Sequence, residues 1–296
     1  MNYPYDLQSH SFFSDGDESP EELAQRAKTE GLLGLILTDH NTILGYERFK
    51  KTCQSINLET IPGVEITARY ENLEIHVLGY SFNFKNNLLQ EALITTVNGY
   101  NKRSKQIVEN CKKTGLADLD FTQLLSQRPA DTYVTKYDIV KALAQTTGQS
   151  KKDLGKLLNA GGKLHVPYGD WAMTPQQAVE IIHQANGVAI LAHPGESKKR
   201  FAGDNKAQAI STMDKLIYEL INMGLDGLEA RHISHTPAEE DKYIKIALDH
   251  KLIITGSSDW HGPYHHPDQK LGTAGLNQSE WQEFISLIKR KTHDNK

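Results

Sequence analysis

The chain has 296 residues, of which 38% are hydrophobic and 24% are charged, and its formal net charge is −4. This composition suits a folded protein with a sizeable core, and the negative total argues against a chain-wide basic surface for nucleic acid. The first residues show no leader pattern and no apolar run approaches the roughly 20 residues that span a bilayer, so we expect a cytoplasmic protein without a membrane partner.

Seven short apolar segments recur along the chain and predict β-strands. Several are followed by helical patterns such as "SPEELAQRAKTEG", in which Ser19 and Glu22 form a capping box. Alternating strands and helices are typical of parallel β/α architecture, and no glycine-rich phosphate fingerprint follows the first strand, which favours a closed barrel over an open sheet. The predicted strands are residues 3–10, 33–40, 59–66, 73–80, 188–194, 226–232 and 252–261.

Residues 86–170 interrupt this alternation with mostly helical patterns. We interpret them as an inserted helical subdomain, and residues 1–85 with 171–296 as the β/α body. The insert carries a charge of +4, which leaves −8 on the body. A basic insert over an acidic body would draw an anionic substrate to their junction. The alternative, that these charges only solvate helix faces, stays open.

Ligand-type side chains fall at or near the ends of most predicted strands. In a β/α barrel these ends meet on one face, so we expect the side chains to converge. A single histidine is more often structural, but so many at several strand ends predict a metal site. Imidazole and carboxylate donors without thiolates suit manganese, zinc or iron, and the number of donors indicates two or three divalent ions. The residues are His10, Asp15, Asp39, His40, Glu65, His76, His193, Asp259 and His261.

Bound ions would leave the site positive, which favours a phosphate group and water activated by metal. A Ser/His/Asp triad could be assembled from Ser257 or Ser258, but no nucleophile-elbow sequence supports it. We therefore expect a metal-dependent phosphoesterase.

The ordered motifs "DLQSHSFFSDG", "TDHNT", "PGVEI", "EIHVLGY", "LAHP" and "GSSDWHG" resemble those of the polymerase and histidinol phosphatase (PHP) superfamily. The resemblance is greatest to its stand-alone bacterial 3′,5′-nucleotide bisphosphate phosphatases and 5′-to-3′ exoribonucleases. It implies a distorted seven-stranded, TIM-like β/α barrel with a trinuclear metal centre that hydrolyses phosphoesters.

The resemblance also implies roles for individual residues. His10, Glu65 and Asp259 would be catalytic, and Asp39 would support the ligands. The implied ligands of the first ion are Gln8, His10, Glu65 and Asp259; those of the second are Glu65, His76 and His193; and those of the third are Asp15, His40 and His261.

Two positions depart from the family pattern. Gln8 stands where the family has a histidine, and an amide oxygen is a weaker zinc ligand, so the first ion is expected to be held loosely. Lys136 and Asp138 stand where an arginine and a histidine usually face the substrate. We name Lys136, Arg200 and Arg231 as candidate phosphate contacts, with a surface cation as the alternative for each. His232, which also follows a strand, remains an open candidate for the pocket.

The expected substrate is a 3′,5′-nucleotide bisphosphate or the 5′ end of a short RNA. Two alternatives remain: a phosphatase for a small metabolite such as histidinol phosphate, and a non-catalytic module that binds metal and nucleotide. Nothing in the sequence points to a protein partner.

Overall fold

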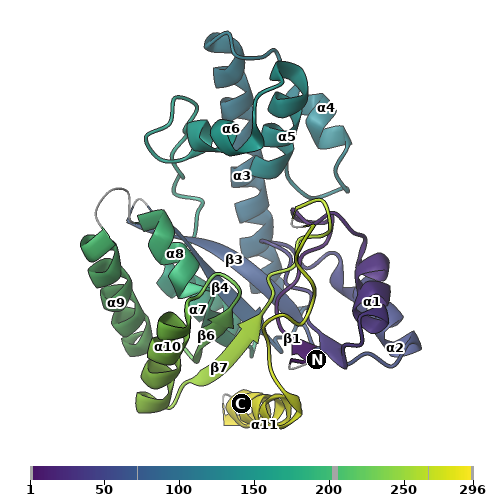
Figure 1. The fold of residues 1–296 in the computed structure, drawn as a ribbon, viewed down its shortest axis with the longest axis vertical. Helices are drawn as coiled ribbons and strands as arrows, with labels where there is room; N and C mark the ends of the chain where they lie inside the picture. Colours follow the sequence, from purple (N-terminus) through teal and green to yellow (C-terminus); the bar gives the residue numbers. More distant parts are fainter. Residues whose placement is uncertain (1–2, 72, 202–205, 266, 295–296) are drawn as a thin grey trace.

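A five-stranded mixed sheet and a separate two-stranded sheet organise the chain, with helices packed around them (Figure 1). The computed structural model describes residues 3–71, 73–201, 206–265 and 267–294. The two-stranded sheet pairs β1 (Tyr5–Asp6) with β2 (Gly34–Leu35) in parallel. The larger sheet has the order β3-β4-β5-β6-β7, from β3 (Gly63–Tyr70), β4 (Leu73–Tyr80), β5 (Val188–Leu191), β6 (Gly227–His232) and β7 (Ile253–Ser257).

The expected closed seven-stranded barrel is wrong, because the described residues form two separate sheets. β3 and β4 form an antiparallel hairpin, since too few residues join them for the crossover of about a dozen or more that a parallel pair needs. β4 also runs antiparallel to β5, and only β5, β6 and β7 pair in parallel. Isolated bridges, Ser9 to Trp260 and His40 to Glu65, link the two sheets in place of continuous ladders.

The β3–β4 hairpin separates apolar from polar side chains by strand alternation. Val64, Ile66 and Val77 enter the main apolar core, which helices α7 (Pro175–Gln184), α9 (Lys206–Asn222) and α10 (Pro237–Asp249) also line. Glu65 and His76 alternate with these residues and therefore point to the other face. The burial of the apolar face thus fixes the direction of two polar side chains.

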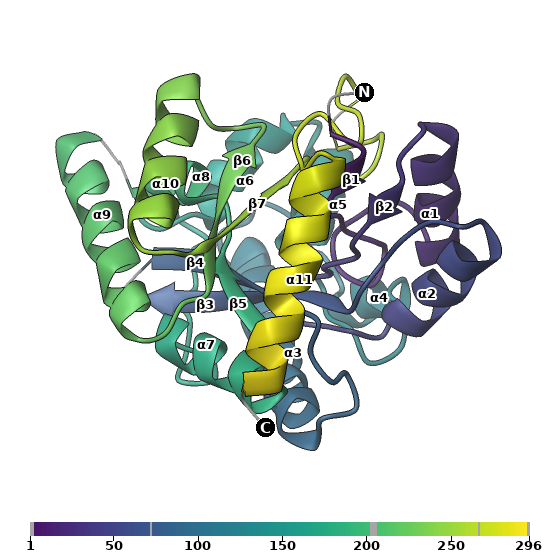
Figure 2. The same ribbon diagram turned by 90° about the horizontal axis from the view of Figure 1, so that it is seen from below.

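The remaining helices of the body cover the two-stranded sheet and the lower side of the molecule. α1 (Pro20–Thr29) and α2 (Tyr46–Ser55) pack together beside β2. The short α8 (Pro194–Phe201) follows β5. Figure 2 shows α11 (Gln278–Asp294) crossing the molecule from below, where Trp281 stacks on Tyr5 with ring centroids 4.7 Å apart.

One long helix, α3 (Asn87–Lys113), connects the body to the segment predicted as an insert. Its first half contributes Leu89 and Leu93 to the main core, and its second half packs against α4 (Phe121–Ser126), α5 (Lys136–Thr147) and α6 (Lys151–Leu158) around a separate apolar cluster (Figure 1). The division into a body and an insert stays a prediction. Among the described residues, no helix is both long enough and apolar enough to cross a membrane.

Candidate metal centre

Glu65 lies at the centre of a buried cluster of imidazole rings. Its Oε1 is 2.7 Å from His76 Nδ1 and 3.0 Å from His193 Nε2, and its Oε2 is 3.2 Å from both His10 Nε2 and His40 Nδ1. The Glu65 side chain is fully buried. One carboxylate therefore joins four histidines from four separate segments of the chain.

Backbone pairing and turn geometry bring these segments together. Asn41 N donates to Glu65 O at 2.8 Å, and this bond holds the turn that carries His40 against β3. His193 lies two residues after the end of β5, and both His193 and Asp259 have positive φ angles, of 24° and 53°. Positive φ in non-glycine residues is uncommon and concentrates at functional sites. The strand ends are therefore bent so that the two side chains reach the cluster.

Two further carboxylates extend the cluster on either side of His10. Asp259 Oδ1 is 3.1 Å from His10 Nε2. Asp15 Oδ1 is 3.5 Å from His261 Nε2, and Asp15 Oδ2 is 3.8 Å from His40 Nε2. Every His, Asp or Glu expected to bind metal thus lies in this one cluster; their roles as ligands stay a prediction.

The pKa shifts of Glu65 and His40 favour the forms that bind metal, whereas for His10 burial lowers the pKa but hydrogen bonds with Asp259 and Glu65 raise it well above its ordinary value. Burial by itself raises the pKa of Glu65, but the nearby imidazoles of His40 and His76 together with hydrogen bonds from His10 and His193 hold that pKa well below its ordinary value. Burial lowers the pKa of His40 to about 4. An ionised carboxylate and a neutral imidazole are the forms that coordinate divalent ions.

The spacing of the side-chain donor atoms fits the binding of metal ions. Three groups of donor atoms each lie within 4.8 Å of one another: His10, Asp15, His40 and His261; His40, Glu65 and His76; and His10, Glu65 and Asp259. Buried atoms in these groups, Asp15 Oδ1 and His40 Nδ1, make no hydrogen bond within the described protein. Buried polar atoms are normally satisfied, so a ligand outside the chain accounts for them. Nitrogen and oxygen donors of this kind suit divalent transition metals.

Asp39 and Gln8 make hydrogen bonds beside the cluster. The Asp39 carboxylate accepts bonds of 2.7 Å from Ser11 N, Ser11 Oγ and Ser14 Oγ, and so fixes the turn that follows His10. Gln8 is fully buried and its Nε2 donates to Asp259 Oδ1 at 2.9 Å. Gln8 thus orients a carboxylate of the site, and the expected roles of Gln8 as a ligand and of Asp39 as a support stay predictions.

The three candidate phosphate contacts lie in different surroundings. Lys136 is exposed and donates to Asn159 within the helical segment. Arg231 Nε is 3.3 Å from Glu240 and its Nη2 is 2.8 Å from Glu280, so its ion pairs are with α10 and α11. Arg200 belongs to α8, but its side chain lies outside the described part of the chain. Their phosphate roles stay predictions.

Two residues that sequence reasoning did not name lie beside the cluster. Arg128, from the loop before α5, is only 10% exposed and donates to the carbonyl of Ser14, next to Asp15. Glu229 is fully buried on β6 and accepts from His193 N at 2.8 Å and from Ser257 Oγ. An acidic residue inside an apolar strand was a signal for Glu229, whereas nothing local in the sequence marked Arg128.

His232 lies beside the cluster as well. It is buried, and its Nε2 is 3.5 Å from Asp259 Oδ2. Burial alone lowers the pKa of His232, but Asp259 and Glu229 raise it above its ordinary value. His232 therefore lies buried beside a candidate metal ligand, where nearby carboxylates favour its protonated form.

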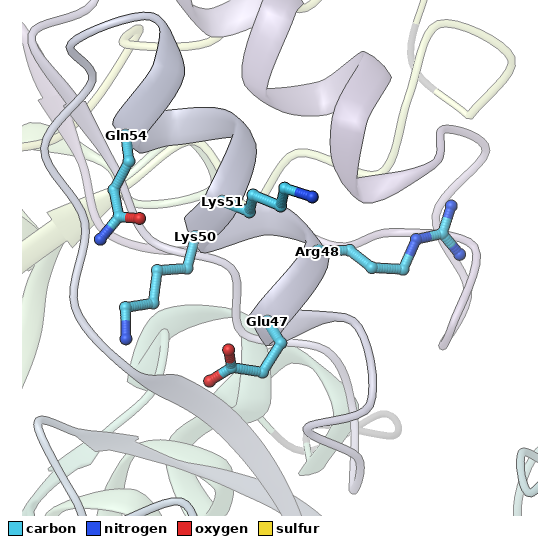
Figure 3. A pocket seen from close by; sticks show the side chains of 5 residues that line it. All are labelled: Glu47, Arg48, Lys50, Lys51 and Gln54. Carbon is cyan, nitrogen blue, oxygen red and sulfur yellow. The ribbon is translucent and has the colours of Figure 1, made fainter.

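A shallow hollow on α2 does not belong to this centre. It is lined by Glu47, Arg48, Lys50, Lys51 and Gln54, and Figure 3 shows Arg48 and Lys50 extending in different directions. Arg48 is engaged by Glu21 of α1 through contacts of 2.8 Å. Its cations therefore do not converge on one anion.

Comparison with known proteins agrees with this geometry. The PHP domain family model matches residues 6–165. A 5′-3′ exoribonuclease of Haemophilus influenzae is 31% identical over 89% of this chain and 92% of its own length. A 3′,5′-nucleoside bisphosphate phosphatase of Chromobacterium violaceum is 24% identical over 87% of each chain. A crystal structure from Bifidobacterium adolescentis, described as that of a metal-dependent phosphoesterase, superposes with a TM-score of 0.80 at 25% identity over 96% of both chains.

Proposed function

The chain belongs to the PHP domain family and is a metal-dependent phosphoesterase, and we propose that it hydrolyses a 3′,5′-nucleotide bisphosphate or the 5′ end of a short RNA. The observation that carries the proposal is the cluster around Glu65, in which one buried carboxylate lies within 3.2 Å of four imidazoles. Two or three divalent ions, of manganese, zinc or iron, would fit its donors.

The proposed ligands fall into three sets that the measured distances support. The chemistry that bound divalent ions supply is polarisation of phosphoryl oxygens and activation of water near neutral pH. His10, Glu65 and Asp259 are the proposed catalytic residues, and Glu65 is the residue that two of the sets share. The sets are Gln8, His10, Glu65 and Asp259; Glu65, His76 and His193; and Asp15, His40 and His261.

Hydrogen bonds made by Glu229, Asp39 and Gln8, the last of which is itself a proposed ligand, hold the other ligands in place. Gln8 fixes Asp259, Glu229 fixes the backbone of His193, and Asp39 fixes the turn after His10. Such supporting hydrogen bonds orient metal ligands and raise their basicity, and their loss lowers activity about 10- to 100-fold. Arg128, which the helical segment brings beside Asp15, is 3.7 Å from Asp138 through its Nε and is the proposed cation for a phosphate.

Support for a nucleotide substrate comes from the relatives and from charge. The Haemophilus relative is named an exoribonuclease and the Chromobacterium relative a nucleoside bisphosphate phosphatase. The segment 86–170 carries +4 against −8 on the rest of the chain, which would draw an anion to their junction. A cytoplasmic location stays a prediction from the sequence.

The proposal is tested by measuring the metal content of the purified protein and its activity on three substrates. We expect phosphate release from adenosine 3′,5′-bisphosphate or nucleotide release from a 5′-phosphorylated oligoribonucleotide, with little from histidinol phosphate. Release from histidinol phosphate alone would refute the nucleotide assignment. A metal-loaded protein that acts on none of the three would refute this substrate assignment altogether.

A further inference from the structure

The turn after His261 is held rigidly beside the metal cluster. Tyr264 N donates to Asp17 Oδ2 at 3.0 Å, and His265 N donates to Gly262 O at 3.2 Å. Gly262 has a φ of 104°, and a Cβ there would lie 2.6 Å from Asp17 Cβ. Only glycine fits so close an approach, so the turn is fixed against the segment that carries Asp15.

The ring that this turn presents to solvent is Tyr264. It is 80% exposed, the largest value for a large hydrophobic side chain among the described residues, where Leu248 follows at 66%. An exposed aromatic ring on a fixed turn adds nothing to the core. Its two faces remain available to a planar ligand, and binding residues are often placed in this way on loops held by a rigid scaffold.

Ring contacts connect this turn to the cluster on one side and to the helical segment on the other. The His265 ring is 5.5 Å from that of His261 and 3.7 Å from that of Tyr137 on α5. Lys151 Nζ lies 5.0 Å from the Tyr137 ring centroid. The residue that follows Tyr264 in the chain thus joins the candidate metal site to the helical segment.

We propose that Tyr264 is a stacking platform for the base of the nucleotide whose phosphate enters the metal centre. This inference rests on the proposed function and adds that the substrate carries a nucleobase, which Tyr264 binds. Every nucleobase has a π face, so a single exposed ring binds bases of any sequence, and nearby cations hold the phosphate backbone. Tyr264 supplies such a ring on the turn that begins three residues earlier at His261, and Lys151 supplies a cation at Tyr137, whose ring contacts that of His265.

Paired substrates with and without a base test the platform. The first is adenosine 3′,5′-bisphosphate, and the second is the same ribose bisphosphate with hydrogen in place of adenine. We expect Tyr264→Leu to raise KM for the first about tenfold, as loss of base stacking would, with kcat and the KM of the second unchanged. Tyr264→Phe keeps the ring and is expected to behave like the unchanged protein.

Tyr218→Leu is the matched control, since Tyr218 is a half-exposed tyrosine on α9 whose ring meets that of His250 edge-on. It should leave both KM values unchanged. The proposal would be overturned if Tyr264→Leu raised KM equally for both substrates, or if it left KM for adenosine 3′,5′-bisphosphate unchanged.

If the proposed function is wrong, the unchanged protein will turn over neither substrate, which distinguishes this outcome from a wrong stacking proposal. Calorimetric titration of the manganese-loaded protein with adenosine 3′,5′-bisphosphate decides the inference in that case. About tenfold weaker binding by Tyr264→Leu than by Tyr264→Phe supports the platform, and equal binding overturns it.

Discussion

Gln8 Nε2 donates a 2.9 Å hydrogen bond to Asp259 Oδ1, the same oxygen that lies 3.1 Å from His10 Nε2. The other end of the amide, Gln8 Oε1, lies 3.4 Å from Ser257 Oγ, whose single proton is donated to Glu229. Both ends of the Gln8 side chain therefore lie against β7 and the turn after it. The amide fixes the direction of Asp259, whether or not its oxygen also meets an ion.

Replacing Gln8 with histidine is expected to raise the amount of metal retained and to preserve or raise activity. An imidazole nitrogen is a better donor to zinc than a neutral amide oxygen, so the first ion would be held more tightly. Metal per chain after dialysis and phosphate release measure the two effects. Gln8→Leu, which has neither donor, should lose both. If Gln8→His had unchanged metal content and much lower activity, the hydrogen bond from Gln8 to Asp259 would contribute more to activity than metal coordination by residue 8.

The position of each strand could be predicted from the sequence, but the pairing of the strands could not be predicted from periodicity alone. All seven predicted segments contain strand residues, because apolar β-branched runs mark them locally. The closed barrel was wrong because the short link between β3 and β4 forces an antiparallel hairpin. The expected convergence of side chains does not depend on closure: His76 lies within β4, and the alternation of the hairpin places it on the face of Glu65.

Residues whose surroundings come from distant segments escaped prediction. Arg231 directly follows an apolar run, which suggested a pocket residue, yet its partners are Glu240 and Glu280. Arg128 lies in a loop without any motif and reaches Ser14 only because the chain folds back by more than one hundred residues. Ion pairs over such separations leave no local pattern in a single sequence.

Glu65→Gln is expected to remove at least one bound ion and to lower kcat by at least about 100-fold. Glutamine has the shape of glutamate but no negative charge. Its amide N–H group would face imidazoles that now contact a carboxylate. Glu74→Gln is the matched comparison, because Glu74 Oε1 contacts the outer nitrogen of His76 at 3.2 Å. A loss within about 10- to 100-fold is expected there. Full metal content and activity in Glu65→Gln would contradict the proposed centre.

Arg128→Ala is expected to raise KM for a nucleotide bisphosphate by about tenfold, the effect of one lost charge-assisted hydrogen bond. The reason is its position, one-tenth exposed beside the turn that carries Asp15. Lys136→Ala should change KM little, since Lys136 is exposed and donates to Asn159. Arg128→Lys keeps the positive charge but lacks the planar guanidinium group with its paired N–H donors. Its KM should lie between that of the unchanged protein and that of Arg128→Ala. A larger effect of Lys136→Ala than of Arg128→Ala would reverse the proposed order of phosphate contacts.

Far from the metal centre, Asp226 joins three elements through one buried carboxylate. Its Oδ2 accepts from Ala189 N and His183 Nε2, each at 2.8 Å, and its Oδ1 accepts from Lys291 Nζ at 2.6 Å. Burial raises the pKa of Asp226, but the bonds from His183, Lys291 and Ala189 lower it below its ordinary value overall. Folding therefore favours the ionised form.

A carboxyl whose pKa is lower in the folded chain stabilises that chain above its unfolded pKa, near 4, and loses the effect as pH falls through the folded pKa. Asp226→Asn should therefore lower the free energy of unfolding by about 1–2 kcal/mol at pH 7, and the difference should shrink below pH 4. Urea unfolding of metal-free protein measures it without interference from metal loss. Asp249→Asn, in an exposed pair with Lys245, should have no measurable effect. A difference that persists unchanged at pH 3 would mean that Asp226 acts through packing and not through its charge.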